Sequence, residues 1–346
     1  MSEKMFAIVK EKPEAGLVLR EVPIPKTGAG EVKIRILKTA VCGTDLHIYK
    51  WDAWSERTIK PPMIIGHEFV GEIVELGDGV TSYKIGDIVS GEGHIVCGTC
   101  RNCMAGRRHL CPHTVGVGVN RDGCFAEYLV IPEANVVRLF EGISQEIAAC
   151  FDPLGNAVHT ALKFDLTGED VLITGAGPIG IMAAAICRHC GAKKIAITDV
   201  NQYRLDLAKS ITPSVYTANP LEISTKELMK EMKMTEGFDV GLEMSGVESA
   251  FADMVENMSN GGSIALLGIH SGKTVINWDK VVFGGLNITG IYGREMYDTW
   301  YKMMSMLQTG MDVSKVITHK FNFKDFNEAF ETMSNGNCGK VILEWS

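Results

Sequence analysis

Four of the ten cysteines are spaced closely enough to share one metal ion. They form the run Cys97-x-x-Cys100-x-x-Cys103, which is followed by Cys111. Four thiolates around one ion are typical of a structural, tetrahedral zinc site, which leaves no coordination position for a substrate. An iron–sulfur cluster is the alternative occupant of four cysteines, but nothing else in the sequence suggests electron transfer. The spacing therefore predicts a structural zinc site.

A second group of metal-binding residue types precedes this lobe. Cys42 begins the segment Cys42-Gly43-Thr44-Asp45-Leu46-His47, and Gly66-His67-Glu68 follows the Pro61-Pro62 turn. One thiolate, one imidazole and one carboxylate can bind zinc and leave a coordination position for a substrate oxygen. Each residue alone also has an ordinary interpretation: a buried thiol, a core histidine and a solvated strand residue. Spacing alone does not decide between the two interpretations.

The segment Gly175-Ala176-Gly177-Pro178-Ile179-Gly180 has the GxGxxG pattern of a dinucleotide-binding turn. It follows an apolar strand predicted over 170–174 and opens a helix predicted over 181–190. In that context the glycines permit a tight turn, the approach of a pyrophosphate, and close packing of helix on strand. Asp199 ends the next predicted strand, where a carboxylate binds the adenosine ribose and repels a 2′-phosphate. NAD is therefore favoured over NADP, although Arg204 is a side chain that can hold a 2′-phosphate.

The elements that must position these residues follow two patterns, and the expected fold class is α/β. Residues 5–40 alternate short apolar runs with proline and glycine, and further short strands are predicted, which indicates a β-rich domain. These further strands are 68–76, 88–90 and 125–131. From about residue 153 strands and helices alternate, which is typical of a parallel sheet with helices on both faces. The tail is predicted to form helices over 299–309 and 325–335 and a last strand over 339–343.

Charge and hydropathy limit the kinds of partner. The formal net charge of -8 argues against binding to nucleic acid or to an anionic membrane surface. No apolar stretch approaches the roughly 20 residues of a membrane span, and the first residues lack the apolar run of a secretory signal. A cytoplasmic location is expected. In such a compartment clustered cysteines indicate metal ligands rather than disulfides.

Together, the segments around Cys42 and His67, the four-cysteine lobe and the GxGxxG turn resemble the zinc-containing medium-chain dehydrogenases. The resemblance covers essentially the whole chain. It implies a GroES-like β-barrel catalytic domain from 1–152 and 297–346, and a Rossmann NAD domain, a doubly wound parallel sheet, over 153–296. It also implies two zinc ions per chain and a homotetramer. In the catalytic site, the zinc ligands that match are Cys42, His67 and Glu68.

The same resemblance assigns further roles. Thr44 and His47 match the pair that relays the alcohol proton outward. Asp152 matches a nearby acidic position where some relatives have glutamate. Because aspartate is one methylene shorter, Asp152 is expected to position a neighbour or relay a proton rather than touch the metal. The matching NAD-contact positions are Ile179, Asp199, Arg204, Leu267, Gly268, Ile269, Ile291 and Tyr292.

Three segments, 42–56, 151–160 and 290–295, look specifically like the branch of this family that oxidises the β-hydroxyl of L-threonine with NAD. Trp51, Trp54 and Arg294 are candidates to line the substrate site, with ordinary packing as the alternative. The nearest alternative function is a polyol or 2,3-butanediol dehydrogenase, which shares the motifs and differs in segment 48–57. A non-catalytic NAD- and zinc-binding protein is the alternative of another class, and the intact set of site residues argues against it.

Overall fold

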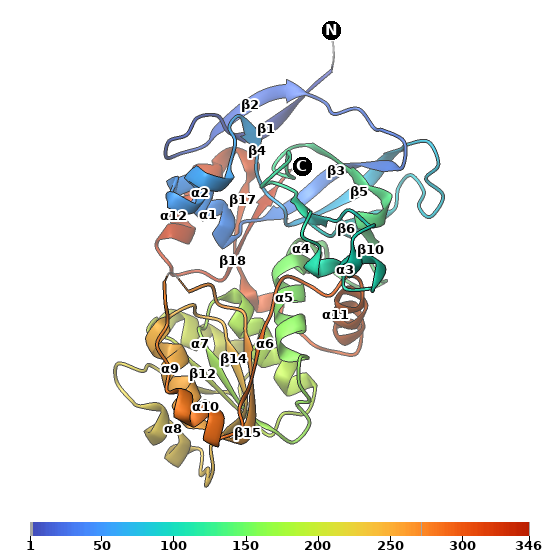
Figure 1. The fold of residues 1–346 in the computed structure, drawn as a ribbon. Coiled ribbons are helices and arrows are strands. Elements are labelled where there is room, and N and C mark those ends of the chain that lie inside the picture. The colour runs from blue at the N-terminus through green and yellow to red at the C-terminus, as the bar shows by residue number, and fades with distance from the viewer. Residues whose placement is uncertain (1–2, 271, 346) are drawn as a thin grey trace. The chain divides into compact units, whose positions relative to one another are not determined.

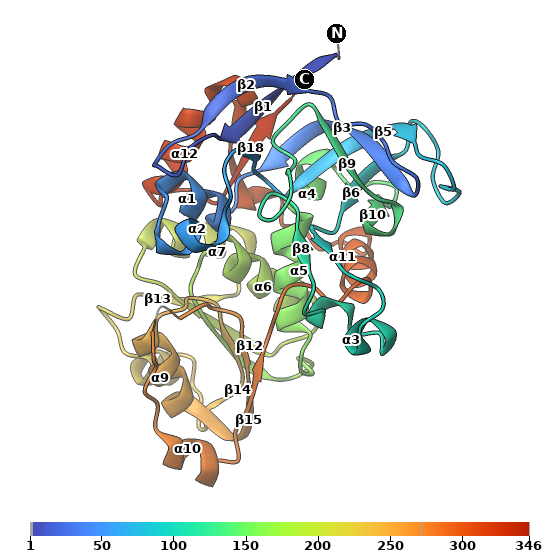
Figure 2. The same cartoon turned by 45° about the horizontal axis from the view of Figure 1, so that its top comes forward.

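A computed structural model describes residues 3–270 and 272–345. The chain divides into two compact units, Met1–Asp152 with Ile317–Ser346, and Pro153–Val316. Figures 1 and 2 show the ribbon from two directions. Among the described residues, no helix combines the length and the apolar character needed to cross a membrane.

The first unit is built mainly from short antiparallel strands. Its strands are β1 (Lys4–Lys10), β2 (Val18–Pro23), β3 (Glu31–Ala40), β4 (Met63–Ile64), β5 (Phe69–Leu76), β6 (Ile88–Gly91), β7 (His94–Ile95), β8 (Val115–Gly116), β9 (Tyr128–Pro132), β10 (Val136–Arg138), β17 (Ile317–Asn322) and β18 (Lys340–Glu344). Its helices are α1 (Gly43–Lys50), α2 (Ala53–Thr58), α3 (Arg101–Met104), α4 (Gln145–Ala149) and α12 (Phe326–Ser334), with short turns η1 (Arg108–Leu110), η2 (Glu133–Asn135) and η4 (Phe323–Asp325).

Alternation along the strands determines how these sheets pack. In β3 the apolar side chains of Val32, Ile34 and Ile36 are buried, and the polar side chains between them face outward, as the period of two requires. One sheet has the order β2-β1-β4, and a larger one runs β10-β6-β5-β3-β18-β17, with β9 also paired to β3. Ile8 of β1 joins the apolar face of the larger sheet in the main core, and Met5, Ala7, Val9 and Ile64 belong to a second, smaller cluster.

The last strand of the chain returns to this early sheet. β18 pairs antiparallel with β3, which also pairs antiparallel with β5. The red C-terminal strands accordingly lie beside the blue N-terminal strands in both views (Figures 1 and 2). The end of β3 and the beginnings of β5 and β18 therefore meet at one edge of the sheet.

The second unit contains a parallel sheet covered by helices. Its strands are β11 (Asp170–Thr174), β12 (Lys194–Thr198), β13 (Tyr216–Ala218), β14 (Phe238–Glu243), β15 (Met258–Leu266) and β16 (Asn287–Gly290). Its helices are α5 (Phe151–Ala161), which begins at the junction of the units, α6 (Pro178–His189), α7 (Gln202–Ile211), α8 (Thr225–Glu231), α9 (Glu248–Asn257), α10 (Trp278–Phe283) and α11 (Asp298–Gln308), followed by the turn η3 (Ser314–Val316).

The strand order of this sheet is β13-β12-β11-β14-β15-β16, and every pair is parallel. The order reverses between β11 and β14. Right-handed crossovers in opposite directions place α6 and α7 on one face and α9 and α10 on the other. Because both faces are covered, β11 is buried along its whole length. The doubly wound parallel sheet predicted from the sequence is confirmed.

The second compact unit continues past the domain boundary that the sequence predicts after residue 296, because it includes α11 and η3. In that unit η3 packs against α6 and α7, Lys315 Nζ donates to Ser210 O at 3.2 Å, and Thr309 Oγ1 lies 3.1 Å from His189 Nε2. These contacts hold the segment after β16 against helices α6 and α7 of the second unit.

Candidate active site and metal centres

The four-cysteine lobe is closed at its base by a small antiparallel pair of strands. β7 pairs with β8 and brings together the two ends of segment 96–114. Cys111 Sγ lies 3.6 Å from Cys97 Sγ and 3.9 Å from Cys100 Sγ, and the four sulfurs lie within 4.8 Å of one another. A zinc tetrahedron with arms of about 2.3 Å has edges of about 3.8 Å. The sulfur spacing therefore fits zinc.

Backbone amides point at these sulfurs. The Cys100 amide lies 3.4 Å from Cys97 Sγ, and the His113 amide lies 3.4 Å from Cys111 Sγ. Amide donors, that of Thr99 first, lower the pKa of the Cys97 thiol to about 6, whereas burial raises the pKa of Cys103 to about 12. Zinc binds cysteine as the thiolate, and four such ligands make a closed, structural site.

The second metal group forms where β3 ends and β5 begins. Cys42 follows β3 and Glu68 precedes β5, so the antiparallel pairing of these strands brings both to one edge. The ligand atoms of Cys42, His67 and Glu68 lie within 4.8 Å of one another. Glu68 is 1% exposed, and its Oε1 has no hydrogen-bond partner among the described residues. A buried carboxylate oxygen without a donor is costly, and a metal ion would satisfy it.

Negative charges surround this group. Asp45 is fully buried; its Oδ2 accepts the Cys42 amide at 2.9 Å, and its Oδ1 lies 3.9 Å from His67 Nδ1. Burial opposes the charged form of His67, yet Cys42, Asp45 and Asp152 hold the pKa of His67 well above its usual value. The site therefore favours a cation. Three protein ligands leave a coordination position for a substrate oxygen.

Lys340 binds the other oxygen of the Glu68 carboxylate. Its Nζ donates to Glu68 Oε2 at 2.5 Å and to Val41 O at 2.8 Å. Lys340 is 4% exposed. Burial disfavours the charge of Lys340, but Glu68 raises its pKa, so the two form an ion pair. One carboxylate oxygen is thus held by protein while Oε1 stays available for a metal.

The predicted relay residues share α1. Thr44 lies in its first turn and is half-buried, whereas His47 lies one turn later and its side chain is 61% exposed. Residues three apart on a helix are neighbours on one face. Thr44 is thus close in sequence to the predicted metal ligand Cys42, and His47 is the solvent-exposed residue of the pair.

Asp152 lies beside the second metal group but outside its set of ligand atoms. It is buried in the first turn of α5. A Cβ built on Gly93 would lie 3.5 Å from His67 Cβ and 3.9 Å from Asp152 Oδ1, which places both residues around the same glycine. Asp152 contributes negative charge to the surroundings of His67 and Glu68.

The glycine-rich turn has the geometry that its pattern implies. Gly175 adopts a φ of 92°, which favours glycine, and a Cβ on Gly180 would lie 1.9 Å from Gly175 O. A Cβ on Gly177 would instead meet nothing within 4 Å. Gly177 is the N-cap of α6, where free amides and the helix dipole favour a phosphate. The open space therefore lies where a pyrophosphate can approach the backbone.

Asp199 and Arg204 border a hollow of about 590 Å³ beside this turn. Asp199 follows β12; its Oδ2 accepts the Ala176 amide at 2.7 Å and its Oδ1 accepts the Asn201 amide at 2.9 Å. These bonds tie the carboxylate to the glycine-rich turn. The volume is typical of a small-molecule site. Other lining residues include Thr174, Val200, Leu221, Ser224 and Met244.

The remaining predicted cofactor positions follow the last two strands of the parallel sheet. Leu267, Gly268 and Ile269 come after β15, and Ile291 and Tyr292 come after β16. Because the strands are parallel, these segments lie at the same sheet edge as the glycine-rich turn. Ile269 and Tyr292 have exposed side chains. The structure thus brings all predicted cofactor residues to the carboxyl ends of the strands.

Of the candidate lining residues, two are engaged in packing. Lys10 Nζ lies over the ring of Trp51, 5.1 Å from the ring centre. Arg294 is 2% exposed, and a Cβ on Gly155 would lie 2.7 Å from its side chain. Trp54 is exposed, and its ring centre lies 6.2 Å from that of His47. Trp51 and Arg294 thus have packing partners, and a role in lining the substrate site stays a prediction for all three residues.

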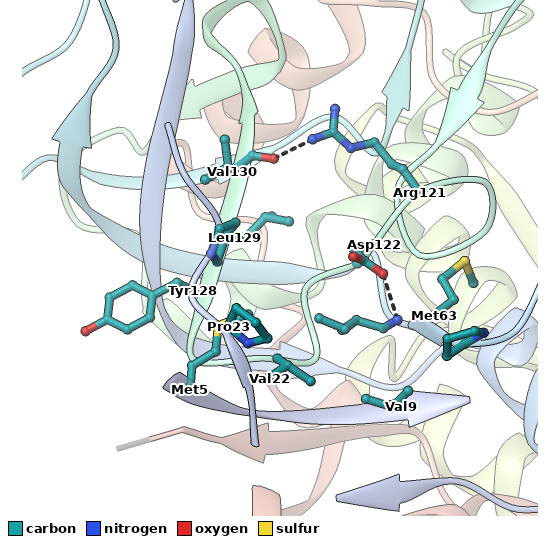
Figure 3. A pocket seen from close by; sticks show the side chains of 14 residues that line it. Met5, Val9, Val22, Pro23, Met63, Arg121, Asp122, Tyr128, Leu129 and Val130 are labelled. Carbon is teal, nitrogen blue, oxygen red and sulfur yellow. Dashed lines mark hydrogen bonds between the residues drawn. The ribbon is translucent and has the colours of Figure 1, made fainter. Parts of the chain in front are cut away.

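A separate hollow of about 490 Å³ lies in the first unit (Figure 3). Its walls are mainly hydrocarbon, from side chains such as Met5, Val9 and Met63. Its polar groups are engaged: Arg121 Nη2 donates to Val130 O at 2.9 Å, and Asp122 Oδ1 accepts the Ile64 amide at 3.0 Å. None of the predicted site residues lines this hollow.

Known proteins resemble this chain along its whole length. Residues 28–141 match the alcohol dehydrogenase GroES-like domain, and residues 178–309 match the zinc-binding dehydrogenase domain. An L-threonine 3-dehydrogenase of Shewanella sp. (strain ANA-3) is 59% identical over 341 residues, which cover 99% of this chain and 100% of that relative. The chain belongs to the zinc-binding dehydrogenase family. It is therefore an enzyme, an oxidoreductase.

Two solved structures share the fold of this zinc-binding dehydrogenase. An alcohol dehydrogenase of Escherichia coli CFT073, in complex with NADH, superimposes with a TM-score of 0.91 at 26% identity, covering 99% of this chain and 100% of its own. A galactitol-1-phosphate dehydrogenase of Escherichia coli has a TM-score of 0.90 at 26% identity, with the same coverage. The GroES-like domain and the membership of the zinc-binding dehydrogenases predicted from the sequence are confirmed. The fold alone does not decide the substrate.

Local sequence patterns do not reveal two further buried residues of this zinc-binding dehydrogenase. Lys340 is one; a charged residue opening the apolar last strand is the signal that could have found it. Glu243 is the other. Its Oε1 accepts the amides of Ser245 and Gly246 at 2.9 and 3.0 Å, and its backbone oxygen accepts the Leu267 amide at 2.9 Å. Glu243 therefore fixes both neighbouring loops: its buried carboxylate holds the loop after β14, and its backbone oxygen holds the loop after β15.

Proposed function

We propose that this dehydrogenase oxidises the β-hydroxyl of L-threonine to 2-amino-3-oxobutyrate, with reduction of NAD to NADH. The observation that carries the proposal is the 59% identity to an L-threonine 3-dehydrogenase across 99% of the chain. The geometry supports it, because a cation-favouring group with three protein ligands lies next to a helix that carries Thr44 and His47.

Two sets of side chains would hold the zinc ions. Cys42, His67 and Glu68 would hold the catalytic ion, and the four-cysteine lobe the structural one. Zinc at the first site supplies a Lewis acid that makes a bound hydroxyl more acidic. Lys340 keeps the Glu68 side chain in place through their ion pair, and such outer partners orient metal ligands. Asp45 holds the Cys42 amide and places a carboxylate 3.9 Å from His67.

The proton of the substrate hydroxyl leaves through α1. Thr44 accepts it, because a hydroxyl can accept one hydrogen bond while donating another. His47, on the same face of α1, receives the proton next and releases it to solvent. Asp152 contributes negative charge beside the metal ligands, and we assign it a role in positioning or proton transfer rather than as a ligand.

The second unit would hold NAD, which supplies the hydride acceptor. The pyrophosphate would approach the N-terminus of α6 at the glycine-rich turn. This turn contains Gly175, Gly177, Ile179 and Gly180. Asp199 and Arg204 would contact the adenosine ribose, and the negative charge of Asp199 would favour NAD over NADP. Further contacts to the dinucleotide would come from the residues after β15 and β16, namely Leu267, Gly268, Ile269, Ile291 and Tyr292.

The test is initial-rate NAD reduction by the purified, zinc-loaded enzyme with L-threonine, D-threonine, sorbitol and 2,3-butanediol compared side by side. We expect kcat/KM for L-threonine to exceed the others by at least about tenfold. Cys42→Ser should abolish turnover, whereas Cys187→Ser, at a buried thiol outside both metal groups, should keep it. Preference for sorbitol or the diol would refute the substrate and make this enzyme a polyol or diol dehydrogenase.

We also propose that the enzyme works as a homotetramer in the cytoplasm. Each of the ten cysteines, all within the described residues, is a free thiol, as a reducing compartment favours. β16 is an outer strand of its sheet, and beside it Val275, Val282 and the 84% exposed Phe283 present apolar surface, which a second copy would cover. Light scattering should give four chains per particle, and Phe283→Asp should give fewer.

A further inference from the structure

The turn between α1 and α2 places a carboxylate against His47. α1 ends at Lys50, and Trp51 adopts a left-handed conformation with a φ of 56° that reverses the chain. Asp52 follows, and its Oδ2 lies 2.5 Å from His47 Nδ1. The ring of Trp51 is held by Lys10 and by the core of the first unit. That packing stabilises a backbone conformation that few residues other than glycine adopt.

The two oxygens of Asp52 have different partners. Oδ1 accepts the amides of Trp54 and Ser55 at 3.1 and 3.0 Å and the Ser55 hydroxyl at 3.1 Å. Asp52 is thus the N-cap of α2. These bonds, that of the Ser55 amide first, lower the pKa of Asp52, so the group is ionised at neutral pH. With Oδ1 fixed on the helix, Oδ2 stays directed at the imidazole.

An ionised carboxylate only accepts hydrogen bonds, so the His47 nitrogen that faces it must donate. In the neutral ring this places the proton on Nδ1 and leaves Nε2 as the acceptor. Trp54, from the same α2, lies edge-on to the ring at an interplanar angle of 60°. The carboxylate and the indole both come from the segment that follows α1, and together they restrict an otherwise exposed imidazole.

We propose that Asp52 is a positioning residue of the proton relay: it holds His47 with Nδ1–H toward Asp52 and with Nε2 free to accept a proton. The proposal rests on the relay role given to His47 above. A proton relay that ends on an exposed histidine needs a ring nitrogen without a proton at the position that receives the proton. A ring that exchanges freely between its two tautomers has that nitrogen unprotonated only part of the time. The alternative is that Asp52 serves solely to cap α2.

Asp52→Asn separates the two roles. Asparagine caps helices as well as aspartate does, so its carbonyl oxygen keeps the amides of Trp54 and Ser55. Its amide nitrogen then faces His47 Nδ1 and donates, which favours the opposite tautomer with the proton on Nε2. The matched control is Glu56→Gln, which removes one negative charge from the exposed side of the same helix.

The experiment combines nitrogen-15 NMR of the His47 ring with steady-state kinetics on zinc-loaded enzyme. We expect the Nδ1–H tautomer to dominate in the unmodified enzyme and in Glu56→Gln, and the Nε2–H tautomer in Asp52→Asn. With the alcohol that the unmodified enzyme oxidises fastest, Asp52→Asn should lower kcat roughly tenfold at unchanged KM.

Unchanged tautomers in Asp52→Asn would overturn the proposal, and so would a switched tautomer with unchanged kcat. The tautomer measurement does not depend on the substrate. Failure of L-threonine as substrate is therefore distinguishable from failure of the Asp52 proposal. His47→Asn should lower kcat at least as much as Asp52→Asn does; a smaller loss would show that Asp52 acts other than through His47.

Discussion

Lys340 Nζ lies 2.5 Å from Glu68 Oε2, and both side chains are almost fully buried. Removal of one partner of such a pair leaves the other charge buried without compensation. We expect Lys340→Met to lower the free energy of unfolding of the metal-free protein by about 3 kcal/mol, measured by urea denaturation. The double variant Lys340→Met/Glu68→Gln should recover at least half of that loss. If the loss of unfolding free energy in the double variant equals the sum of the losses in Lys340→Met and Glu68→Gln, the two side chains are not coupled.

The two metal groups should lose zinc independently. Cys103→Ser replaces a thiolate by a poor zinc ligand, so elemental analysis should find one zinc per chain instead of two. Segment 96–114 should then become sensitive to limited proteolysis, because the metal no longer crosslinks it. Cys42→Ser should also lose one zinc, but segment 96–114 should stay protected from proteolysis. Cys187→Ala is the control; two zinc ions in Cys103→Ser would refute the four-cysteine site.

The glycines of the cofactor turn should differ in what they tolerate. In Gly177→Ala the new methyl group meets no protein atom, so the free energy of unfolding should fall by less than about 1 kcal/mol. NADH binding, followed by nicotinamide fluorescence, should weaken at least about tenfold, because the methyl group occupies the space beside the amides of α6. Gly180→Ala should instead unfold more easily, since its Cβ meets Gly175 O. Undiminished NADH affinity of Gly177→Ala would place the pyrophosphate elsewhere.

Acid should destabilise the first unit partly through Asp87. Burial opposes the charge of this group, but the Lys84 amide at 3.0 Å and Arg138 Nη2 at 2.6 Å lower its pKa. A lowered carboxyl pKa gives stability that is present above about pH 4 and disappears as the pH falls through the folded-state value. Asp87→Asn should therefore cost about 2 kcal/mol at pH 7 and much less at pH 2.5, by urea denaturation. Exposed Glu331→Gln serves as control, and equal losses at both pH values would exclude this linkage.

Local spacing was enough to predict much of the site. The four sulfurs fall within a short segment, so their geometry depends on a few residues, and the structure brings them to zinc spacing. The apolar strand 170–174, the turn after it and Asp199 likewise follow one another closely in a repeating strand–helix pattern, which the sequence displays directly.

Contacts between residues distant in sequence could not be predicted from local spacing. Glu68 and Lys340 are 272 positions apart, and only the pairing of β3 with both β5 and β18 makes them neighbours. The strand β16, short and half-polar, carries no clear alternation and was not predicted. The helix α1 was not predicted either: its few apolar residues make a poor stripe, and its start depends on the bond from the Cys42 amide to Asp45.

The pairing of the last strand with β3 also sets an order of assembly during biosynthesis. Cys42, His67 and Glu68 emerge from the ribosome early, whereas Lys340 emerges only after the whole of Pro153–Val316 has been made. Until then Glu68 lacks the counter-charge that makes its burial tolerable, and β3 lacks one of its neighbours. The nascent first unit therefore cannot complete its fold until β18 is made, whereas the second unit can complete its own sheet before then. A chain that stops short of β18 would carry every predicted zinc ligand and still lack a finished catalytic site.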